Sequence, residues 1–83
     1  MNMEKIYIVE LKQVPNTDSN QVLRNILFTS YDKDKARIQF MSYILDKLYA
    51  IKDAKIKEFN NSSYTIIDKF YKSVYTLYEF ELN

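Results

Sequence analysis

The stretch KDKARIQFMSYILDKLYAI, residues 33–51, contains neither Pro nor Gly. Apolar residues recur in it at spacings of three and four, which predicts an amphipathic helix from Lys33 to about Ile51. Thr29 or Ser30 is suited to cap this helix, because a side-chain hydroxyl can accept a hydrogen bond from the free backbone N–H groups of the first turn. We therefore expect one main helix near the middle of the chain.

This helix has more apolar surface than one neighbour can cover. On a helical wheel its apolar residues span an arc of roughly 200°, whereas a helix lying on one sheet needs about 100°. They form two adjacent stripes, the first with Ala36, Phe40, Tyr43, Ile44 and Ile51 and the second with Ile38, Met41, Leu45, Leu48 and Tyr49. Several exposed large apolar side chains would favour aggregation. The second stripe is therefore expected to be covered by the C-terminal segment, by a second copy of the chain or by a different protein.

The N-terminal third predicts an antiparallel hairpin. Lys5–Leu11 is rich in β-branched and aromatic residues and apolar on both faces, which favours a central strand. Val14–Gln21 holds the only Pro and a cluster of turn-forming residues, so we expect a loop there. Val22–Thr29 is the second predicted strand. Its apolar residues divide between two faces, one with Val22, Ile26 and Phe28 and the other with Leu23 and Leu27.

The C-terminal third allows two interpretations. Tyr64–Phe70 and Val74–Leu82 are dense in aromatic and β-branched residues, which favours strands joined near Lys72 and Ser73. The alternative is a second helix, because 3.6-residue spacing is also met by Ile67, Phe70, Tyr71, Val74, Leu77 and Tyr78. Ala54–Phe59 precedes a predicted turn at residues 60–63 and either extends the first helix or forms a short strand. We prefer the strands because β-forming residue types dominate.

Together these elements predict a single small α+β domain over residues 1–83, with a small antiparallel sheet packed on one main helix in the order β-β-α-β(-β). A length of 83 residues leaves little room for a second domain. Hydrophobic residues make up 47% of the chain and charged residues 28%, a balance typical of a globular protein and not of a disordered one.

The residue types that the chain lacks exclude several classes of function. Cys and His are absent, so the chain has no zinc finger, thiol nucleophile or Ser-His-Asp triad. Gly is also absent, which excludes the P-loop and the dinucleotide fingerprint, because both need backbone that approaches phosphate closely. We therefore expect no cofactor, no metal site and no catalysis. The remaining enzyme hypothesis would place Asp, Lys or Tyr in a concave pocket.

Charge and hydropathy narrow the range of partners. A net charge of +1 argues against a basic protein that wraps nucleic acid and against an acidic mimic of DNA. No segment approaches the run of about 18 apolar residues that a membrane span needs, and no signal-peptide pattern is present. We therefore expect a cytoplasmic protein without a membrane partner.

Aromatic residues gather toward the C-terminus, and Tyr is common at protein interfaces because it offers a large, rigid contact with a polar tip. This density and the second helix stripe predict a surface that binds another protein or complex, or a second copy in a homodimer. The candidate partner-binding residues are Tyr71, Tyr75, Tyr78, Tyr49, Leu45, Glu79 and Glu81. A purely structural interpretation remains open, in which a small sheet uses Tyr to cover its half-exposed face.

Nucleic acid is the less expected partner. A binding surface for it would combine basic residues with neighbouring aromatic rings, at Lys52, Lys55, Lys57, Lys69 and Lys72. The cations of the helical region are scattered around the helix and offset by acidic residues, which is more typical of a solvated face. Glu79 and Glu81 share one face of their predicted strand, where solvation is the simplest interpretation.

The composition also carries a resemblance. Lys, Asn, Ile and Tyr supply 34 of the 83 residues, and their codons have A or T in the first two positions. In size, residue bias and strand-rich layout the chain resembles the small orphan proteins of phages and mobile elements of low-GC bacteria. The resemblance implies an anti-defence or host-takeover role in the host cytoplasm. Such a protein would be an inhibitor that binds and occludes a host protein, with CRISPR–Cas (an anti-CRISPR activity) as one example.

Overall fold

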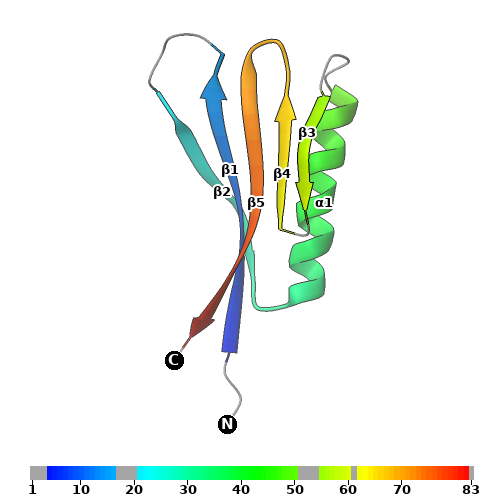
Figure 1. Cartoon of the computed structure of the whole chain (residues 1–83). Coiled ribbons are helices and arrows are strands. Elements are labelled where there is room, and N and C mark those ends of the chain that lie inside the picture. Colours follow the sequence, from blue (N-terminus) through cyan, green and yellow to red (C-terminus); the bar gives the residue numbers. More distant parts are fainter. Residues whose placement is uncertain (1–3, 17–20, 51–54, 61, 83) are drawn as a thin grey trace.

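The computed structural model describes residues 4–16, 21–50, 55–60 and 62–82. Along the chain the elements are β1 (Glu4–Pro15), β2 (Leu23–Ser30), α1 (Lys33–Ala50), β3 (Lys55–Asn60), β4 (Ser63–Ile67) and β5 (Tyr71–Leu82). The strands form one antiparallel sheet, and α1 packs against it (Figure 1). The predicted α+β class is confirmed. Three strands follow the helix, where the sequence predicted one or two, so the order is β-β-α-β-β-β.

The sheet has the strand order β2-β1-β5-β4-β3. β1 and β5 pair along their whole lengths, from Glu4 opposite Leu82 to Pro15 opposite Tyr71. The first and last strands of the chain are therefore neighbours in the middle of the sheet, and β1 begins where β5 ends (Figure 1). The two apolar faces of β1 predict a central strand, and it lies between β2 and β5.

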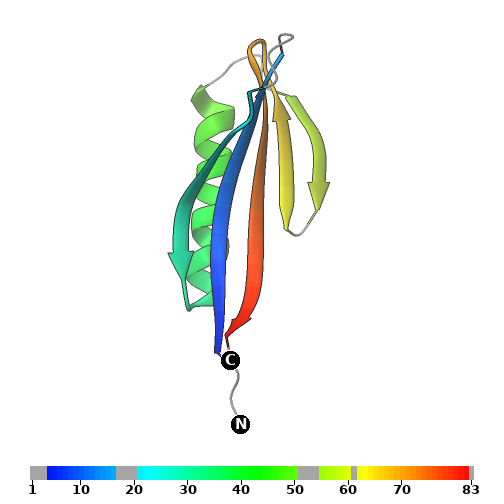
Figure 2. The ribbon, with the colours of Figure 1, turned by 90° about the vertical axis from the view of Figure 1, so that its left-hand side faces the viewer.

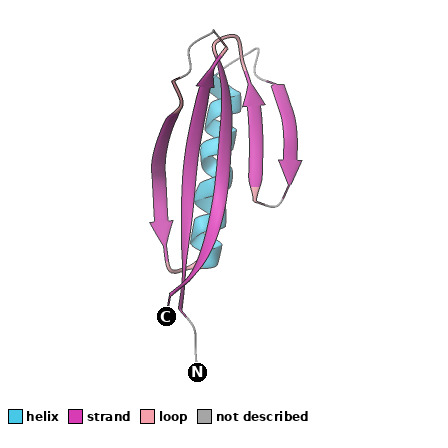
Figure 3. Ribbon diagram, turned by 60° about the vertical axis from the view of Figure 1, so that its left-hand side comes forward, coloured by secondary structure: helices cyan, strands magenta, loops and turns pink. Residues whose placement is uncertain are grey.

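The helix covers one side of the sheet only (Figures 2 and 3). It packs mainly on β1, β2 and β5. Side chains alternate between the two faces of a strand, and directly opposed residues share a face. Val9, opposite Leu77, is buried beneath the helix, so the odd-numbered residues of β1 and β5 face α1. The even-numbered residues of these two strands lie on the open side.

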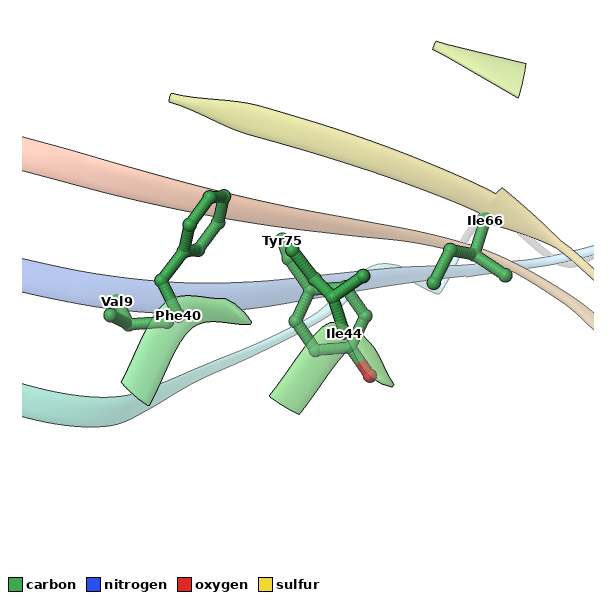
Figure 4. Close-up of a cluster of buried hydrophobic side chains, with 5 residues drawn as sticks. All are labelled: Val9, Phe40, Ile44, Ile66 and Tyr75. Carbon is green, nitrogen blue, oxygen red and sulfur yellow. The ribbon is translucent and has the colours of Figure 1, made fainter. Parts of the chain in front are cut away.

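The core lies between α1 and the sheet. Figure 4 shows five buried side chains, from β1, α1, β4 and β5, that form it: Val9, Phe40, Ile44, Ile66 and Tyr75. The first helix stripe is confirmed as the buried side, since Ala36, Phe40 and Ile44 are buried and Tyr43 packs against the core. The hydroxyl of Tyr43 donates a hydrogen bond to the Leu27 carbonyl oxygen at 3.0 Å. Ile51, also placed in that stripe, lies outside the described residues.

The N-cap differs from the prediction. Asp32 caps α1, because its Oδ1 accepts the backbone N–H groups of Asp34 at 2.9 Å and Lys35 at 3.2 Å. The Ser30 hydroxyl oxygen instead accepts the N–H of Asp32 at 2.9 Å. A carboxylate at this position also interacts favourably with the positive end of the helix dipole, which explains why it takes the role expected of Thr29 or Ser30.

A β-bulge interrupts the predicted alternation of β2. Val9 lies opposite Phe28 and Glu10 opposite Ile26, so Leu27 is the extra residue on the bulged strand. Leu27 and Phe28 both pack against the core, whereas Ile26 is exposed. The prediction that Ile26 and Phe28 share a face is therefore wrong, because the extra residue inverts the alternation between them.

The C-terminal third consists of strands, so the second-helix interpretation is wrong. Lys55–Asn60 is a short strand, which was one of the two alternatives for this segment. The turn between β4 and β5 was predicted near Lys72 and Ser73 but lies a few residues earlier. Its position is explained by Asp68, whose Oδ1 accepts the backbone N–H groups of Phe70 at 2.7 Å and Tyr71 at 2.8 Å. An Asp side chain that bonds the backbone two and three residues later stabilises a turn at that point.

Candidate interaction surfaces

The second helix stripe is exposed. Tyr49 is 87% exposed, Ile38 65% and Leu45 48%, and Met41 is also exposed. We call these four residues the outer stripe. Leu48, which the sequence placed in the same stripe, packs against the core instead. In the part of the chain that the structure describes, the C-terminal strands lie on the other side of α1 and leave the outer stripe uncovered.

Part of the side of the sheet that faces away from α1 is also apolar. We call it the open face and define it by Ile6, Ile8, Ile26, Tyr78, Phe80 and Leu82, which the register places on one side. Ile26 and Phe80 are 64% and 48% exposed, and Tyr78 and Leu82 are exposed as well. The rings of Tyr78 and Phe80 stack with centroids 5.8 Å apart. The open face therefore presents packed aromatic and aliphatic side chains to solvent.

The three candidate tyrosines of the C-terminal third do not form one surface. Tyr75 is buried in the core, so its prediction as a surface residue is wrong. Tyr78 lies on the opposite side of β5, in the open face, and its hydroxyl donates to Glu10 Oε1 at 3.4 Å. Tyr71 is half-buried at the start of β5, beside the turn. Alternation along the strand places Tyr78 on the face opposite Tyr71 and Tyr75, because residues at odd spacing point to opposite faces.

Glu79 and Glu81 lie on the side of β5 that faces α1 but beyond the buried core, and both are exposed. A carboxylate oxygen of Glu79 is 3.7 Å from Lys5 Nζ. Burial first and the neighbouring Glu79 second raise the pKa of Tyr7, which lies opposite Glu79 in the sheet. The acidic pair thus lies near groups of its own chain, and its exposure fits the solvated interpretation.

Of the five lysines predicted to bind nucleic acid, the structure describes the side chains of two. Lys69 and Lys72 are exposed at the β4–β5 turn, and Lys69 Nζ lies 5.9 Å from the centroid of the Phe70 ring. The side chains of Lys52, Lys55 and Lys57 lie outside the described residues. The described part of this candidate surface is therefore small, with two lysines beside one ring. A groove that binds nucleic acid contacts the phosphates of several successive nucleotides.

A buried ion pair links α1 to the β4–β5 turn. Asp68 Oδ2 lies 3.5 Å from Lys47 Nζ, with side chains 2% and 18% exposed. Desolvation would raise the pKa of Asp68, but two backbone N–H donors and Lys47 outweigh it and hold this pKa below 3.8. Burial, with help from Asp46 and Asp68, raises the pKa of Tyr75. Sequence reasoning missed Asp68, although an Asp just before an apolar strand is a turn signal that could have identified it.

Two hollows lie on the surface of the described part of the chain. One is lined by Glu4, Lys5, Tyr7 and Tyr31, and another by Tyr7, Lys33, Arg37, Ser62, Leu77 and Glu79. Among the side chains described, in residues 4–16, 21–50 and 62–82, no three acidic groups converge as metal ligands. None of the helix residues described forms a segment long and apolar enough to cross a membrane.

No protein family model, curated protein or solved structure matches this chain. The functional argument therefore depends on the two uncovered apolar surfaces, the outer stripe and the open face.

Proposed function

We propose that this protein is a non-catalytic binding module that docks the outer stripe of α1 into a groove on another protein. The observation that carries the proposal is the exposure of Ile38, Leu45 and Tyr49 along one side of a helix whose other side is already buried. Apolar anchors at helical spacing are the pattern by which a helix occupies a hydrophobic groove.

The helix is held in place before any partner arrives. Asp32 caps its N-terminus, Phe40 and Ile44 anchor its middle, and Lys47 near its last turn is paired with Asp68. A binding element that is already ordered loses less conformational entropy on association. Burial of one large apolar side chain contributes about 1.5–3 kcal/mol, so two or three anchors are enough for a specific contact.

The finer form of the proposal is a phage-type inhibitor that occludes a host protein, with defence systems such as CRISPR–Cas as the target class. It is supported by the residue bias and size that the chain shares with small proteins of low-GC phages and mobile elements. Occlusion needs only a surface and no reacting groups, which suits a chain without Cys or His.

The test is a binding experiment with matched variants. Tagged wild-type protein, the double variant Leu45→Ala/Tyr49→Ala and the control Phe70→Ala are used as baits in lysate of a low-GC bacterium, with and without nuclease treatment. Phe70 is an exposed aromatic outside the outer stripe, at the β4–β5 turn. Any protein held by the wild type and the control is then purified and its affinity measured directly.

We expect the double variant to bind this purified protein about 100-fold more weakly, because two anchors lose burial, while Phe70→Ala binds normally. Equal affinity for all three baits, or binding that disappears on nuclease treatment, would overturn the proposal. Far-UV circular dichroism confirms that each variant is folded.

A further inference from the structure

We propose that the open face of the sheet is covered by a second copy of this chain, in a two-fold symmetric sandwich with the helices outside. The surface differs from the outer stripe, so this inference does not depend on the proposed function. In such a dimer both outer stripes stay exposed on opposite sides of the particle.

The composition of the open face is the first argument. An antiparallel sheet with one face in water normally places polar residues on that face. Here the two central strands place Ile6, Ile8, Tyr78 and Phe80 there, each opposite another of the four: Ile8 pairs with Tyr78 and Ile6 with Phe80. These four adjacent side chains resemble the inner face of a β-sandwich more than a solvated surface.

The size of the whole side of the sheet that carries the open face is the second argument. β1 and β5 have 12 residues each, β2 has 8, β4 has 5 and β3 has 6. At about 3.3 Å per residue and about 4.8 Å per strand, their flat area is on the order of 700 Å². A stable interface buries about 800 Å² on each partner, and side-chain relief adds to the flat area. One copy therefore offers nearly the area that a dimer needs.

The charges on this side are the third argument. Glu4 lies at one end of the even-numbered row of β1, and Lys12 lies toward the other end. Arg24 is directly opposite Lys12, and Lys72 is opposite Val14, so three cations lie toward the second end. Glu10 lies in the same row between Ile8 and Lys12 and accepts the Tyr78 hydroxyl, which leaves the second end with a net positive charge. A two-fold axis across the strands near Ile8 would place the Glu4 end of each copy over the basic end of the other. The two ends of this side of the sheet are thus complementary in charge, which favours an isologous interface.

Overall charge and twist are compatible with this arrangement. The net charge of +1 per chain causes little repulsion between copies. Two sheets with the same twist pack face to face at about 30° and about 10 Å apart, so their side chains interdigitate. The stacked rings of Tyr78 and Phe80 would then lie near the middle of the contact, where aromatic anchors contribute most.

The first experiment measures mass by light scattering or sedimentation over a range of concentrations. The wild type should reach twice the 10.0 kDa chain mass. Phe80→Asp should be a monomer at concentrations where the wild type is a dimer, because the interface would bury an unpaired charge. Phe70→Asp, which places the same charge at an exposed aromatic position outside the open face, should remain a dimer.

A charge swap tests the orientation. Glu4→Lys and Lys12→Glu should each weaken the dimer about tenfold, and the double variant should recover most of the loss. The two residues are eight apart on one strand, about 26 Å, so recovery requires contact between copies.

A monomeric wild type, or a Phe80→Asp variant that still dimerises, would overturn the proposal. So would a different protein whose capture is abolished by Phe80→Asp while the wild type stays monomeric, since the open face would then serve another partner. Leu45→Ala/Tyr49→Ala should leave the dimer intact. The outer-stripe variant therefore tests the proposed function alone, and Phe80→Asp tests the dimer alone.

Discussion

Single residues decide how distant parts of this chain are joined, and Asp68 is the clearest case. Its Oδ1 accepts the N–H groups of Phe70 and Tyr71, and its Oδ2 lies 3.5 Å from Lys47 Nζ. Its carbonyl oxygen accepts the side-chain amide of Asn16 at 2.8 Å. One carboxylic acid residue therefore links the β4–β5 turn, the helix and the residue that follows β1.

Replacement of this carboxylate should be costly. Asp68→Ala should lower the free energy of unfolding by about 3 kcal/mol, because two hydrogen bonds to a charged carboxylate are lost and Lys47 keeps a mostly buried charge without its partner. Asp68→Asn should cost less, about 1 kcal/mol, because its amide oxygen can still accept the two turn hydrogen bonds. Urea denaturation at neutral pH measures both values. Equal stability of Asp68→Ala and wild type would contradict this role.

The lowered pKa of Asp68 predicts a pH dependence of stability. The folded protein holds this proton less tightly than the unfolded chain, whose pKa is near 3.8. The contribution to stability is therefore complete above about pH 5 and is lost as the pH falls through 3.8 toward the lower folded pKa. Urea midpoints between pH 6 and pH 2.5 should fall less steeply for Asp68→Asn than for wild type. Parallel curves for the two proteins would refute the assignment.

At the scale of elements, α1 is apolar on two sides that differ in their surroundings. Ile44 is fully buried, while its neighbour Leu45 is 48% exposed. The outer stripe lies outside the buried core of the monomer, and its exposed side chains are therefore available for binding.

Truncation of these two neighbouring residues to Ala should therefore have very different effects on stability. Ile44→Ala should lower the free energy of unfolding by about 3 kcal/mol, through lost burial and a cavity. Leu45→Ala should change it by less than about 0.5 kcal/mol, because an exposed side chain is removed and Ala favours the helix. Chemical denaturation compares them, at a concentration low enough to populate monomers. Similar losses for both variants would mean that something covers Leu45.

At the scale of the whole molecule, the chain ends pair with each other, since β1 and β5 are the central neighbours of the sheet. The pairing between β4 and β5 covers only Ser63–Ile67 and Lys72–Thr76. Beyond it, the Leu77 N–H donates to the Ser62 carbonyl at 2.8 Å, which shows that odd-numbered N–H groups of β5 point toward the β4 side. Among the described residues no strand lies beside Glu79 and Glu81 on that side.

Hydrogen exchange should therefore alternate along the end of β5. The N–H groups of Tyr78 and Phe80 point toward β1 and should exchange slowly, whereas those of Glu79 and Glu81 should exchange at least about 100-fold faster. Amide exchange followed by NMR gives the rate at each residue. Uniform protection over these four residues would show that another strand occupies this edge.

Much of the fold could be predicted because it depends on local patterns. The helix from Lys33, the strands on either side of it and the second helix stripe can all be predicted from residue spacing. This spacing depends only on residues close together in the chain. Errors arose where one side chain overrode the pattern. The carboxylate of Asp68 shifted a turn, Asp32 took the capping role, and the extra residue Leu27 inverted one face of β2.

The candidate site was harder to predict for the same reason. The stripe that holds Leu45 and Tyr49 could be counted from the sequence as apolar surface that needs a cover, and in the structure both residues are exposed. Tyr75 was placed on the surface wrongly, because alternation shows that Tyr75 and Tyr78 point to opposite sides of a strand but not which side receives the helix.

The sequence by itself determined the α+β class, the main helix and an apolar surface larger than one neighbour could cover. Only the tertiary structure decided that β5 pairs with β1 in the centre of the sheet, that Tyr75 is buried while Tyr78 is exposed, and that the open face lies opposite α1. Local backbone geometry depends on adjacent residues, whereas the choice of strand neighbours and of the covered face depends on contacts between residues far apart in the chain.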